Sequence, residues 1–516
     1  MLAPHRESPP PLPAPRVDTA TPSPGVKRHA VFLVPLLDRW LVFAPLLRLA
    51  ALVNEPAARA LRSGEGLRGP GLLSELVDRL RRPPASVPRP LDGEVCPSFL
   101  GIMPTRGCNL ACVYCNFGGP SADKVDMEPK VAVAAVDWMA ERLVRASRRD
   151  FQVHFFGGEP FISPDVVDIV VHRVRQQAAR HDLVPYLGAS TNGVFSESRA
   201  QFIGDYFDRV VLSLDGPPEF HDRHRPALQG RPSFEVVSRT AKQLGRMPVD
   251  LCLRACITDD SVGEVEGITR WMIESFRPAA VSLESLTPGV LAARAGLEVP
   301  DPYRFAIHCI GAYRLAARMG VRAVYCAAET ERPRLSFCPV GTDALIVSPE
   351  GRLSACYLLP EDWRARGLDM DVGRVDADGR VSIDAVALDR ARTLPLGKPR
   401  CERCFCQWTC AGGCHVNQTP PGCSDRYTAF CIQTRLVTAC LLLRDLGGED
   451  LADELLGDRR AMERVGEHAW DPVDIGTTEA WGGIEDRVAA ARPSLPYGGA
   501  SERPRSTIAE GLAWLG

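Results

Sequence analysis

Three cysteines that lie close together in the sequence have a spacing suited to metal chemistry. Cys108, Cys112 and Cys115 form a C-x3-C-x2-C arrangement just after the apolar run 99–104. Iron–sulfur clusters are held by thiolates and usually take four, so a set of three leaves one iron of a 4Fe-4S cube without a protein ligand. An open coordination position implies chemistry, as it does at catalytic zinc. A zinc site normally adds a second cysteine pair or histidines, and neither lies nearby, so the spacing favours a cluster.

This segment resembles the signature of the radical S-adenosylmethionine (radical SAM) enzymes, in which an aromatic residue precedes the last of the three cysteines. Tyr114 fills that position. The resemblance implies that the methionine part of S-adenosyl-L-methionine chelates the open iron. It also implies that reductive cleavage of SAM gives a 5′-deoxyadenosyl radical, which takes a hydrogen atom from a substrate. The cofactor supplies this chemistry, and the protein binds it, orients it and excludes solvent.

Polar motifs follow several strand-like runs in the middle of the chain. Gly157-Gly158-Glu159-Pro160 follows the run 151–156, and its bare backbone allows a ligand to approach closely. The segment 211–225, with Ser213-Leu214-Asp215-Gly216 and a later His-Asp-x-x-Arg, is similar to a segment of anaerobic sulfatase maturases and related peptide-modifying enzymes. The resemblance implies SAM contacts from Tyr114, Gly157, Gly158, Glu159, Ser190, Asn192, Ser213 and Arg225, with Arg254 as a further candidate. Asp215 could instead be an ordinary helix N-cap.

Strand and helix patterns alternate from about residue 98 to residue 320. The six strand candidates are 99–104, 151–156, 184–189, 210–214, 249–255 and 280–283. Regular alternation predicts a parallel sheet with right-handed crossovers, and motifs at the carboxyl ends of successive strands belong on the active face of a (β/α) barrel. We therefore predict an α/β fold built on the partial (β/α)6 barrel of the radical SAM family.

Seven cysteines in the C-terminal half match a second pattern. The residues are Cys338, Cys356, Cys401, Cys404, Cys410, Cys414 and Cys431, with Gly351 five positions before the second. The pattern resembles the SPASM extension of radical SAM enzymes. The resemblance implies two auxiliary 4Fe-4S clusters, one on Cys401, Cys404, Cys410 and Cys431 and the other on Cys338, Cys356 and Cys414. A zinc ribbon over 401–414 is the alternative, but it would leave the flanking thiols without a metal.

The second auxiliary set lacks an obvious fourth ligand. Sulfatase maturases have a cysteine shortly before the first of this set, where the present chain has Arg332. Cys326 is the best remaining candidate, and without it the iron is open and could bind substrate. With the cluster on Cys108, Cys112 and Cys115, the expected cofactors are SAM and three 4Fe-4S clusters.

Tyr357 bears on the reaction. Sulfatase maturases place an aspartate directly after the second cysteine of the set, where it is thought to act as the base in formylglycine formation, but this chain has Tyr357 there. We therefore expect a radical SAM/SPASM maturase that oxidatively modifies a ribosomally made peptide or a protein side chain. A crosslink is the favoured product. The alternatives are formylglycine formation on a sulfatase and a non-catalytic zinc scaffold.

Composition and domain pattern complete the prediction. A net charge of −3 and a pI near 6.4 give no electrostatic case for nucleic acid or an anionic membrane. The sequence shows neither a signal peptide nor a membrane-spanning run, and its 18 cysteines are clustered by motif. We therefore expect a cytoplasmic protein. The expected parts are a disordered Pro-rich tail (1–26), an α+β module with linker (27–95), the barrel (96–322), the SPASM extension (323–442) and a helix with polar tail (443–516).

The N-terminal module and the electron supply concern partners. We expect a hairpin over 29–44 and helices over 46–64 and 71–82. Related peptide-modifying enzymes often carry a module here that grips the leader of a precursor peptide, and a structural collar is the alternative. The expected partners are a peptide or protein substrate and an electron donor such as flavodoxin or ferredoxin.

Overall fold

The computed structural model describes most of the chain. It covers residues 31–64, 71–115, 117, 124–338, 341–396, 398–418, 427–473 and 475. The predicted tail 1–26 and the C-terminal tail beyond residue 475 lie outside the described residues. Within these ranges, no helix is long and apolar enough to cross a membrane.

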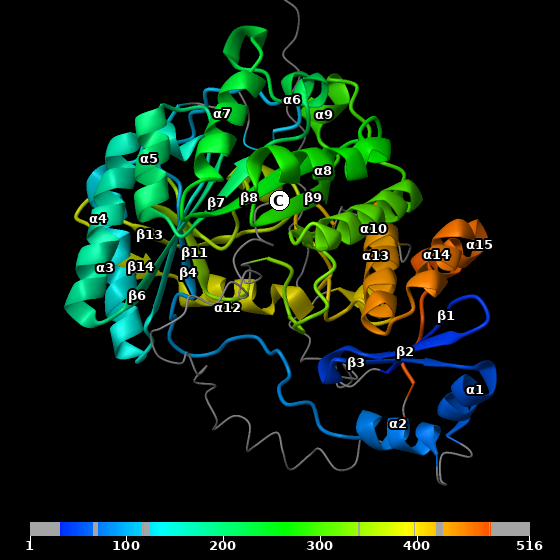
Figure 1. Ribbon diagram of the computed structural model, residues 1–516. Helices are drawn as coiled ribbons and strands as arrows, with labels where there is room; N and C mark the ends of the chain where they lie inside the picture. The colour runs from blue at the N-terminus through cyan, green and yellow to red at the C-terminus, as the bar shows by residue number, and fades with distance from the viewer. Residues whose placement is uncertain are drawn as a thin grey trace, which may run out of the picture.

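One large sheet organises the protein (Figure 1). Its strand order is β10-β9-β8-β7-β6-β5-β4-β11-β12-β13-β14. Neighbours from β10 through β4 to β11 are parallel, whereas β12, β13 and β14 pair antiparallel. The bounds are β4 Phe99–Ile102, β5 Asp150–Phe155, β6 Val184–Thr191, β7 Arg209–Ser213, β8 Asp250–Ile257, β9 Ala280–Ser285, β10 Arg322–Val324, β11 Ala344–Val347, β12 Arg352–Ser354, β13 Asp371–Val375 and β14 Val381–Ile383.

The predicted α/β class with a parallel sheet is confirmed. Each of the six strand candidates corresponds to one of the strands β4–β9. The structure adds a parallel strand at each side of these six, β10 next to β9 and β11 next to β4. Strand β11 is short, and it comes from the cysteine-rich half of the chain, so the C-terminal region extends the sheet of the barrel rather than standing apart from it.

Helices cover the outer face of the parallel strands, as Figure 1 shows. Those that follow the strands are α3 Pro129–Arg145, α4 Pro164–His181, α5 Glu197–Tyr206, α6 Pro218–His224, α7 Phe234–Leu244, α8 Val265–Phe276, α9 Val290–Arg294 and α10 Pro302–Arg318. Leu212 and Leu253 pair across β7 and β8 and belong to the main core with these helices. Ser213 pairs with Arg254, and by strand alternation both point to the opposite, inner face.

The N-terminal module differs from prediction. It contains three antiparallel strands, β1 Phe32–Pro35, β2 Trp40–Ala44 and β3 Leu49–Val53, followed by α1 Glu55–Ser63 and α2 Leu72–Leu80. The expected helix over 46–64 is wrong in its first half, because Arg48 turns the chain in a left-handed conformation (φ 51°) and β3 then pairs with the whole of β2. A short apolar run cannot distinguish a strand from a helix by periodicity alone.

The C-terminal helices pack against both the barrel and the N-terminal module. They are α11 Pro360–Arg364, α12 Ala385–Thr393, α13 Ala429–Asp445, α14 Glu449–Gly457 and α15 Arg459–Glu467. Gln433 of α13 donates hydrogen bonds to Ser285 Oγ (2.6 Å) and Tyr325 Oη (2.7 Å), which joins this helix to the barrel. Arg464 of α15 donates to the carbonyl oxygen of Leu36 (3.2 Å).

A buried ion pair joins the linker, β11 and α12. Arg392 donates two hydrogen bonds to Asp343 (2.7 and 2.6 Å) and a third to the carbonyl of Gly93 (2.9 Å). The side chains of the pair are 2% and 3% exposed. Removing one partner of such a pair leaves the other charge buried without compensation, and this costs several kcal/mol.

We predict that Asp343→Ala destabilises the protein by about 3–5 kcal/mol. Urea unfolding followed by circular dichroism measures the effect. The matched control is Glu463→Gln, which removes an exposed ion pair with Arg459 and should change stability by less than about 1 kcal/mol. Equal effects of the two substitutions would contradict the structural role of the Asp343–Arg392 pair.

Candidate iron–sulfur and SAM site

The loop with Cys108, Cys112 and Cys115 leaves the carboxyl end of β4 and is held by backbone hydrogen bonds. The amide of Ala111 donates to the carbonyl of Pro226 (2.8 Å), and that of Val113 donates to the carbonyl of His224 (3.0 Å). These bonds align the loop antiparallel to the segment that follows α6. These backbone hydrogen bonds therefore fix the course of the loop that carries the three cysteines.

The Gly157-Gly158 pair packs directly against this loop. The amide of Gly158 donates to the carbonyl of Thr105 (3.1 Å), and the amide of Glu159 donates to the carbonyl of Gly107 (2.9 Å). A Cβ on Gly158 would lie 1.9 Å from the Gly107 oxygen, and Gly157 has a φ of 136°. The glycines are predicted to let a ligand approach, and the structure shows that they also let the strand β5 approach the cysteine loop.

Glu159 links this segment to the end of β6. Its carboxylate accepts hydrogen bonds from Thr191 Oγ1 (2.8 Å), the Asn192 amide (2.7 Å) and the Phe161 amide (3.2 Å). Burial raises the pKa of Glu159 to about 7, although the three hydrogen bonds oppose this shift. Glu159 is fully buried, so it positions the polar loop ends around the cysteine loop.

Two further predicted residues lie on β6 or directly after it. The side-chain amide of Asn192 donates to Asn109 Oδ1 (2.8 Å) and approaches the Cys108 sulfur (3.5 Å). Ser190 Oγ lies 3.1 Å from His154 Nε2, and burial lowers the pKa of His154 to about 3. Asn192 thus contacts the cysteine loop itself, whereas Ser190 lies further down the inner face of the sheet.

Asp215 has a larger part in the site than its motif alone indicates. It is fully buried, and it accepts hydrogen bonds from Tyr114 Oη (2.5 Å) and the Cys256 amide (3.1 Å). Arg225 Nε lies 3.1 Å from its carboxylate. Burial alone would raise the pKa of Asp215, but the Arg225 charge and the His224 hydrogen bond outweigh burial and hold it below the usual range.

The alternative interpretation of Asp215 as a helix N-cap is wrong. Helix α6 begins after Pro217 and has no side-chain cap. Arg225, which Asp215 holds, also points toward the cysteines, with its Nη1 3.8 Å from Cys112 Sγ. The buried pair therefore holds a positive charge beside the cysteine loop. The Ser-Leu-Asp-Gly spacing contained this signal, but only the folded chain shows that the carboxylate is buried.

The inner face of the sheet carries the remaining predicted contacts. Ser213, Arg254 and Ser282 pair in register across β7, β8 and β9, so their side chains share one face. Glu284 lies two residues further along β9 on the same face, and it accepts a hydrogen bond from Ser282 Oγ (3.0 Å). This row gives the barrel a polar interior next to the cysteine loop.

Cys326 belongs to this interior. Its thiol donates to Glu284 Oε2 (2.8 Å), and its amide donates to Oε1 (3.1 Å). The charges that act most strongly on it are those of Glu284, Arg254 and Arg334. Cys326 belongs to the main hydrophobic core, against which Cys338 and Cys414 also pack. That Cys326 is the fourth ligand of the set Cys338, Cys356 and Cys414 stays a prediction.

The thiols of the cysteine loop fit a site that needs positive charge. Burial raises the pKa of Cys108 to about 11 and that of Cys112 to about 12, and the other thiols of the loop add to both shifts. Such thiols ionise only when a cation is provided, which iron does. Among the described residues, no three ligating side chains converge on a single ion. Thiolates of a cube bind different irons, so they need not converge.

The C-terminal cysteines form two groups. Cys401, Cys404, Cys410 and Cys431 influence one another electrostatically, as do Cys338, Cys356 and Cys414. A thiol hydrogen bond from Cys406 lowers the pKa of Cys404 to about 6; burial opposes this shift, and the buried Arg435 supports it. All described cysteines are free thiols. Both groups therefore present free thiols, rather than disulfides, as possible metal ligands.

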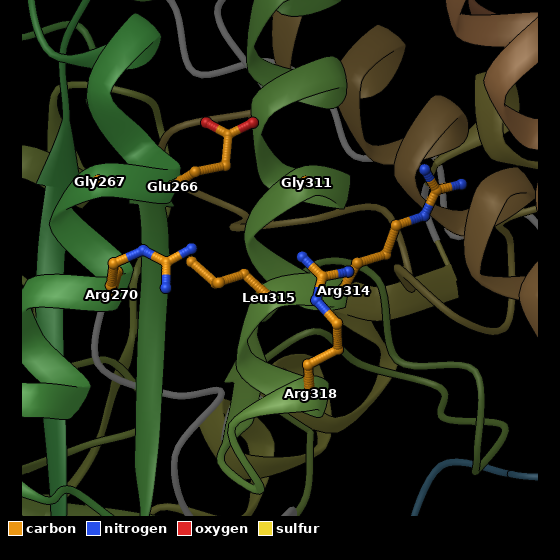
Figure 2. A pocket seen from close by; sticks show the side chains of 7 residues that line it. All are labelled: Glu266, Gly267, Arg270, Gly311, Arg314, Leu315 and Arg318. Atoms are coloured by element: carbon orange, nitrogen blue, oxygen red, sulfur yellow. The ribbon is translucent and has the colours of Figure 1, made fainter.

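A pocket of about 370 Å³ lies away from the cysteine loop, between α8 and α10 (Figure 2). Its lining includes Arg270, Arg314, Arg318 and Glu266. Arg314 is paired with Asp453, and Glu266 is paired with His308, so much of the charge is already compensated. The pocket is on the helical side of the sheet and takes no part in the site.

Comparison with known proteins identifies the class. The family model of the radical SAM superfamily matches residues 102–270, which include the cysteine loop and every strand end described above from β4 to β8. The chain therefore contains a radical SAM domain.

Two curated relatives are anaerobic sulfatase-maturating enzymes. The cysteine-type anaerobic sulfatase-maturating enzyme of Clostridium perfringens is 27% identical over 181 residues, which is 34% of this chain and 49% of that relative. The serine-type enzyme of Klebsiella aerogenes is 21% identical over 347 residues, 63% of this chain and 82% of that relative. The first match thus spans about half the length of the relative. The chain is related to the anaerobic sulfatase-maturating enzymes.

The solved structure of native anSMEcpe with bound AdoMet has the same fold. The superposition covers 70% of this chain and 100% of the anSMEcpe chain, with a TM-score of 0.54 and 17% sequence identity. The same protein has also been solved with bound AdoMet and the Cp18Cys peptide. At this level of identity the likeness concerns the fold alone.

We predict that Gly158→Ala lowers the iron content of anaerobically reconstituted protein and destabilises it by about 1–3 kcal/mol, because the added Cβ would overlap the Gly107 carbonyl. Iron and sulfide analysis with thermal unfolding checks this. Gly457→Ala is the control: no atom lies within 4 Å of its Cβ position, so iron content should not change. Full iron content in Gly158→Ala would refute the close backbone approach.

Proposed function

We propose that this enzyme oxidatively modifies a ribosomally synthesised peptide or a protein side chain, with a crosslink as the favoured product. The observation that carries the proposal is the cysteine loop, held at the carboxyl ends of β4–β7 beside the buried Asp215–Arg225 pair. The second support is the cysteine-rich C-terminal region that extends the same sheet through β11.

The residues of the barrel have distinct roles in this proposal. Cys108, Cys112 and Cys115 would hold the cluster that leaves one iron for SAM. When bound, the cluster and SAM supply a 5′-deoxyadenosyl radical that removes a hydrogen atom from the substrate. The side chains and bare backbone that would orient SAM are those of Tyr114, Gly157, Gly158, Glu159, Ser190, Asn192, Ser213, Arg225 and Arg254. Glu159 would act mainly through Thr191 and Asn192, since its carboxylate already accepts three hydrogen bonds.

The C-terminal thiols would hold the two auxiliary 4Fe-4S clusters. Closing a crosslink after loss of a hydrogen atom releases one more proton and one electron, so the enzyme needs an electron acceptor. Cys401, Cys404, Cys410 and Cys431 form a complete ligand set. The set of Cys338, Cys356 and Cys414 would take Cys326 as its fourth ligand, or it would leave one iron open for a substrate group.

Formylglycine formation is the second candidate, and it is favoured by the relatives, which are sulfatase-maturating enzymes. Tyr357 opposes it. Its ring packs edge-on against Phe156 with centroids 4.0 Å apart, and burial raises its pKa well above that of an ordinary phenol. A buried phenol of this kind does not act as a base near neutral pH.

The partners are a peptide or protein substrate and an electron donor such as flavodoxin or ferredoxin. The N-terminal module offers a place for the leader of a precursor peptide. Within the described residues β3 pairs on one side only, with β2, so its other edge presents unpaired backbone groups of the kind that extended peptides bind.

The test is a reaction with anaerobically reconstituted enzyme, SAM, dithionite and a candidate precursor peptide, chosen from short reading frames beside the gene. We expect 5′-deoxyadenosine together with a peptide that is lighter by two hydrogen atoms, and neither product from Cys112→Ala. Chromatography with mass spectrometry measures both products.

A parallel co-expression with a sulfatase distinguishes the two candidates. Activation of the sulfatase with no change in the peptide would replace crosslinking by formylglycine formation. A wild-type enzyme that forms no more 5′-deoxyadenosine than Cys112→Ala would refute both.

A further inference from the structure

A short turn separates the two auxiliary thiol sets. It consists of Ala411, Gly412 and Gly413, and all three residues have a left-handed backbone, with φ values of 52°, 77° and 67°. Cys410 precedes the turn and Cys414 follows it, so the turn carries one thiol of each set. A left-handed backbone conformation costs free energy, above all at an alanine, so the surrounding structure must stabilise this turn.

Lys398 holds this turn. Its ammonium donates hydrogen bonds to the carbonyl oxygens of Gly412 (3.1 Å) and Gly413 (2.8 Å). A Cβ on Gly412 would lie 2.9 Å from Lys398 Nζ and 3.2 Å from Cys401 Sγ. The ammonium and this sulfur therefore both lie next to Gly412. Glycine at position 412 leaves the space that the lysine occupies.

The charge of Lys398 faces thiols of both sets. The groups that act on its ammonium are Cys401 and Cys410 of the four-cysteine set and Cys338 and Cys414 of the three-cysteine set. Burial lowers the pKa of Lys398, whereas these thiolates oppose the shift. In the described part of the chain, no carboxylate forms an ion pair with it. A largely desolvated ammonium without a carboxylate keeps its charge best beside another source of negative charge, which thiolates of the two sets would provide.

The choice of lysine is itself informative. The chain has only five lysines among its 61 basic residues. The other cations near these thiols are arginines: Nη1 of the buried Arg435 lies 3.9 Å from Cys404 Sγ, and the half-buried Arg334 acts on Cys410. Each of these arginines acts on the four-cysteine set. A lysine ammonium is a compact point charge, so it can act on groups on both of its sides.

We propose that the Lys398 ammonium is a counter-charge shared by the two auxiliary clusters, and that it raises the reduction potential of both. This inference rests on the proposed function, because it requires clusters at both thiol sets. The potential of an iron–sulfur cluster depends on nearby charge, on hydrogen bonds to its sulfurs and on burial. A fixed positive charge stabilises the reduced, more negative state of each cluster, so both become better electron acceptors. Lys398 is a positioning residue that touches neither substrate nor SAM.

The test compares Lys398→Gln with Lys398→Arg in protein whose Cys108, Cys112 and Cys115 are replaced by alanine, so that only the auxiliary clusters remain. Redox titration followed by electron paramagnetic resonance measures their midpoint potentials. We expect Lys398→Gln to lower both potentials by at least about 59 mV, a tenfold change in a one-electron equilibrium. Lys398→Arg, which keeps the charge, should restore most of the shift, and Lys242→Gln at an exposed site should have no effect.

Loaded clusters with unchanged midpoint potentials in Lys398→Gln would overturn the inference. A change in the potential of only one of the two clusters would also overturn it. If Lys398→Gln fails to load iron, Lys398→Met replaces it. Should both neutral variants fail to load while Lys398→Arg loads fully, the charge is needed for assembly and the inference stands; failure of Lys398→Arg as well would make the role steric and overturn it. Absence of auxiliary iron when residue 398 is lysine would instead refute the auxiliary clusters of the proposed function.

Discussion

Buried thiolates must be matched by positive charge, and this constraint explains much of the structure. Burial raises the pKa of Cys108, Cys112, Cys401 and Cys410, so these thiols ionise only beside a cation. Iron would provide most of that charge in the loaded enzyme. The chain adds cations of its own, and each is held by neighbouring groups: Arg225 by Asp215, Arg435 by the carbonyl of Val465, and Lys398 by the 411–413 turn.

The sequence predicted the barrel well because its signals are local. Strands β4 to β9 are apolar runs, polar motifs follow several of them, and parallel topology brings the ends of such strands to one edge. Strand β11 was not predicted, because its place beside β4 depends on pairing between residues 99–102 and 344–347. Strand β3 was mistaken for helix because five apolar residues are compatible with both. Interactions that depend on distant parts of the chain are not visible in periodicity.

The candidate site shows the same division. Motif spacing identified the cysteines and most of the polar residues around them, because the chemistry requires those residue types. It did not show that the Asp215 carboxylate is buried or that Cys326 lies against Glu284, since both facts depend on how β7, β8 and β9 align. Lys398 carried no motif at all. Its importance follows only from the two thiol sets that the fold places around it.

The central claim is that the cluster on Cys108, Cys112 and Cys115 keeps one iron open for the amino and carboxylate groups of SAM. The most direct measurement is electron–nuclear double resonance of the dithionite-reduced enzyme with SAM labelled with ¹⁵N at its amino group. We expect a ¹⁵N coupling to the cluster that is absent in Cys112→Ala. A spectrum without that coupling in the fully loaded wild-type enzyme would contradict the claim.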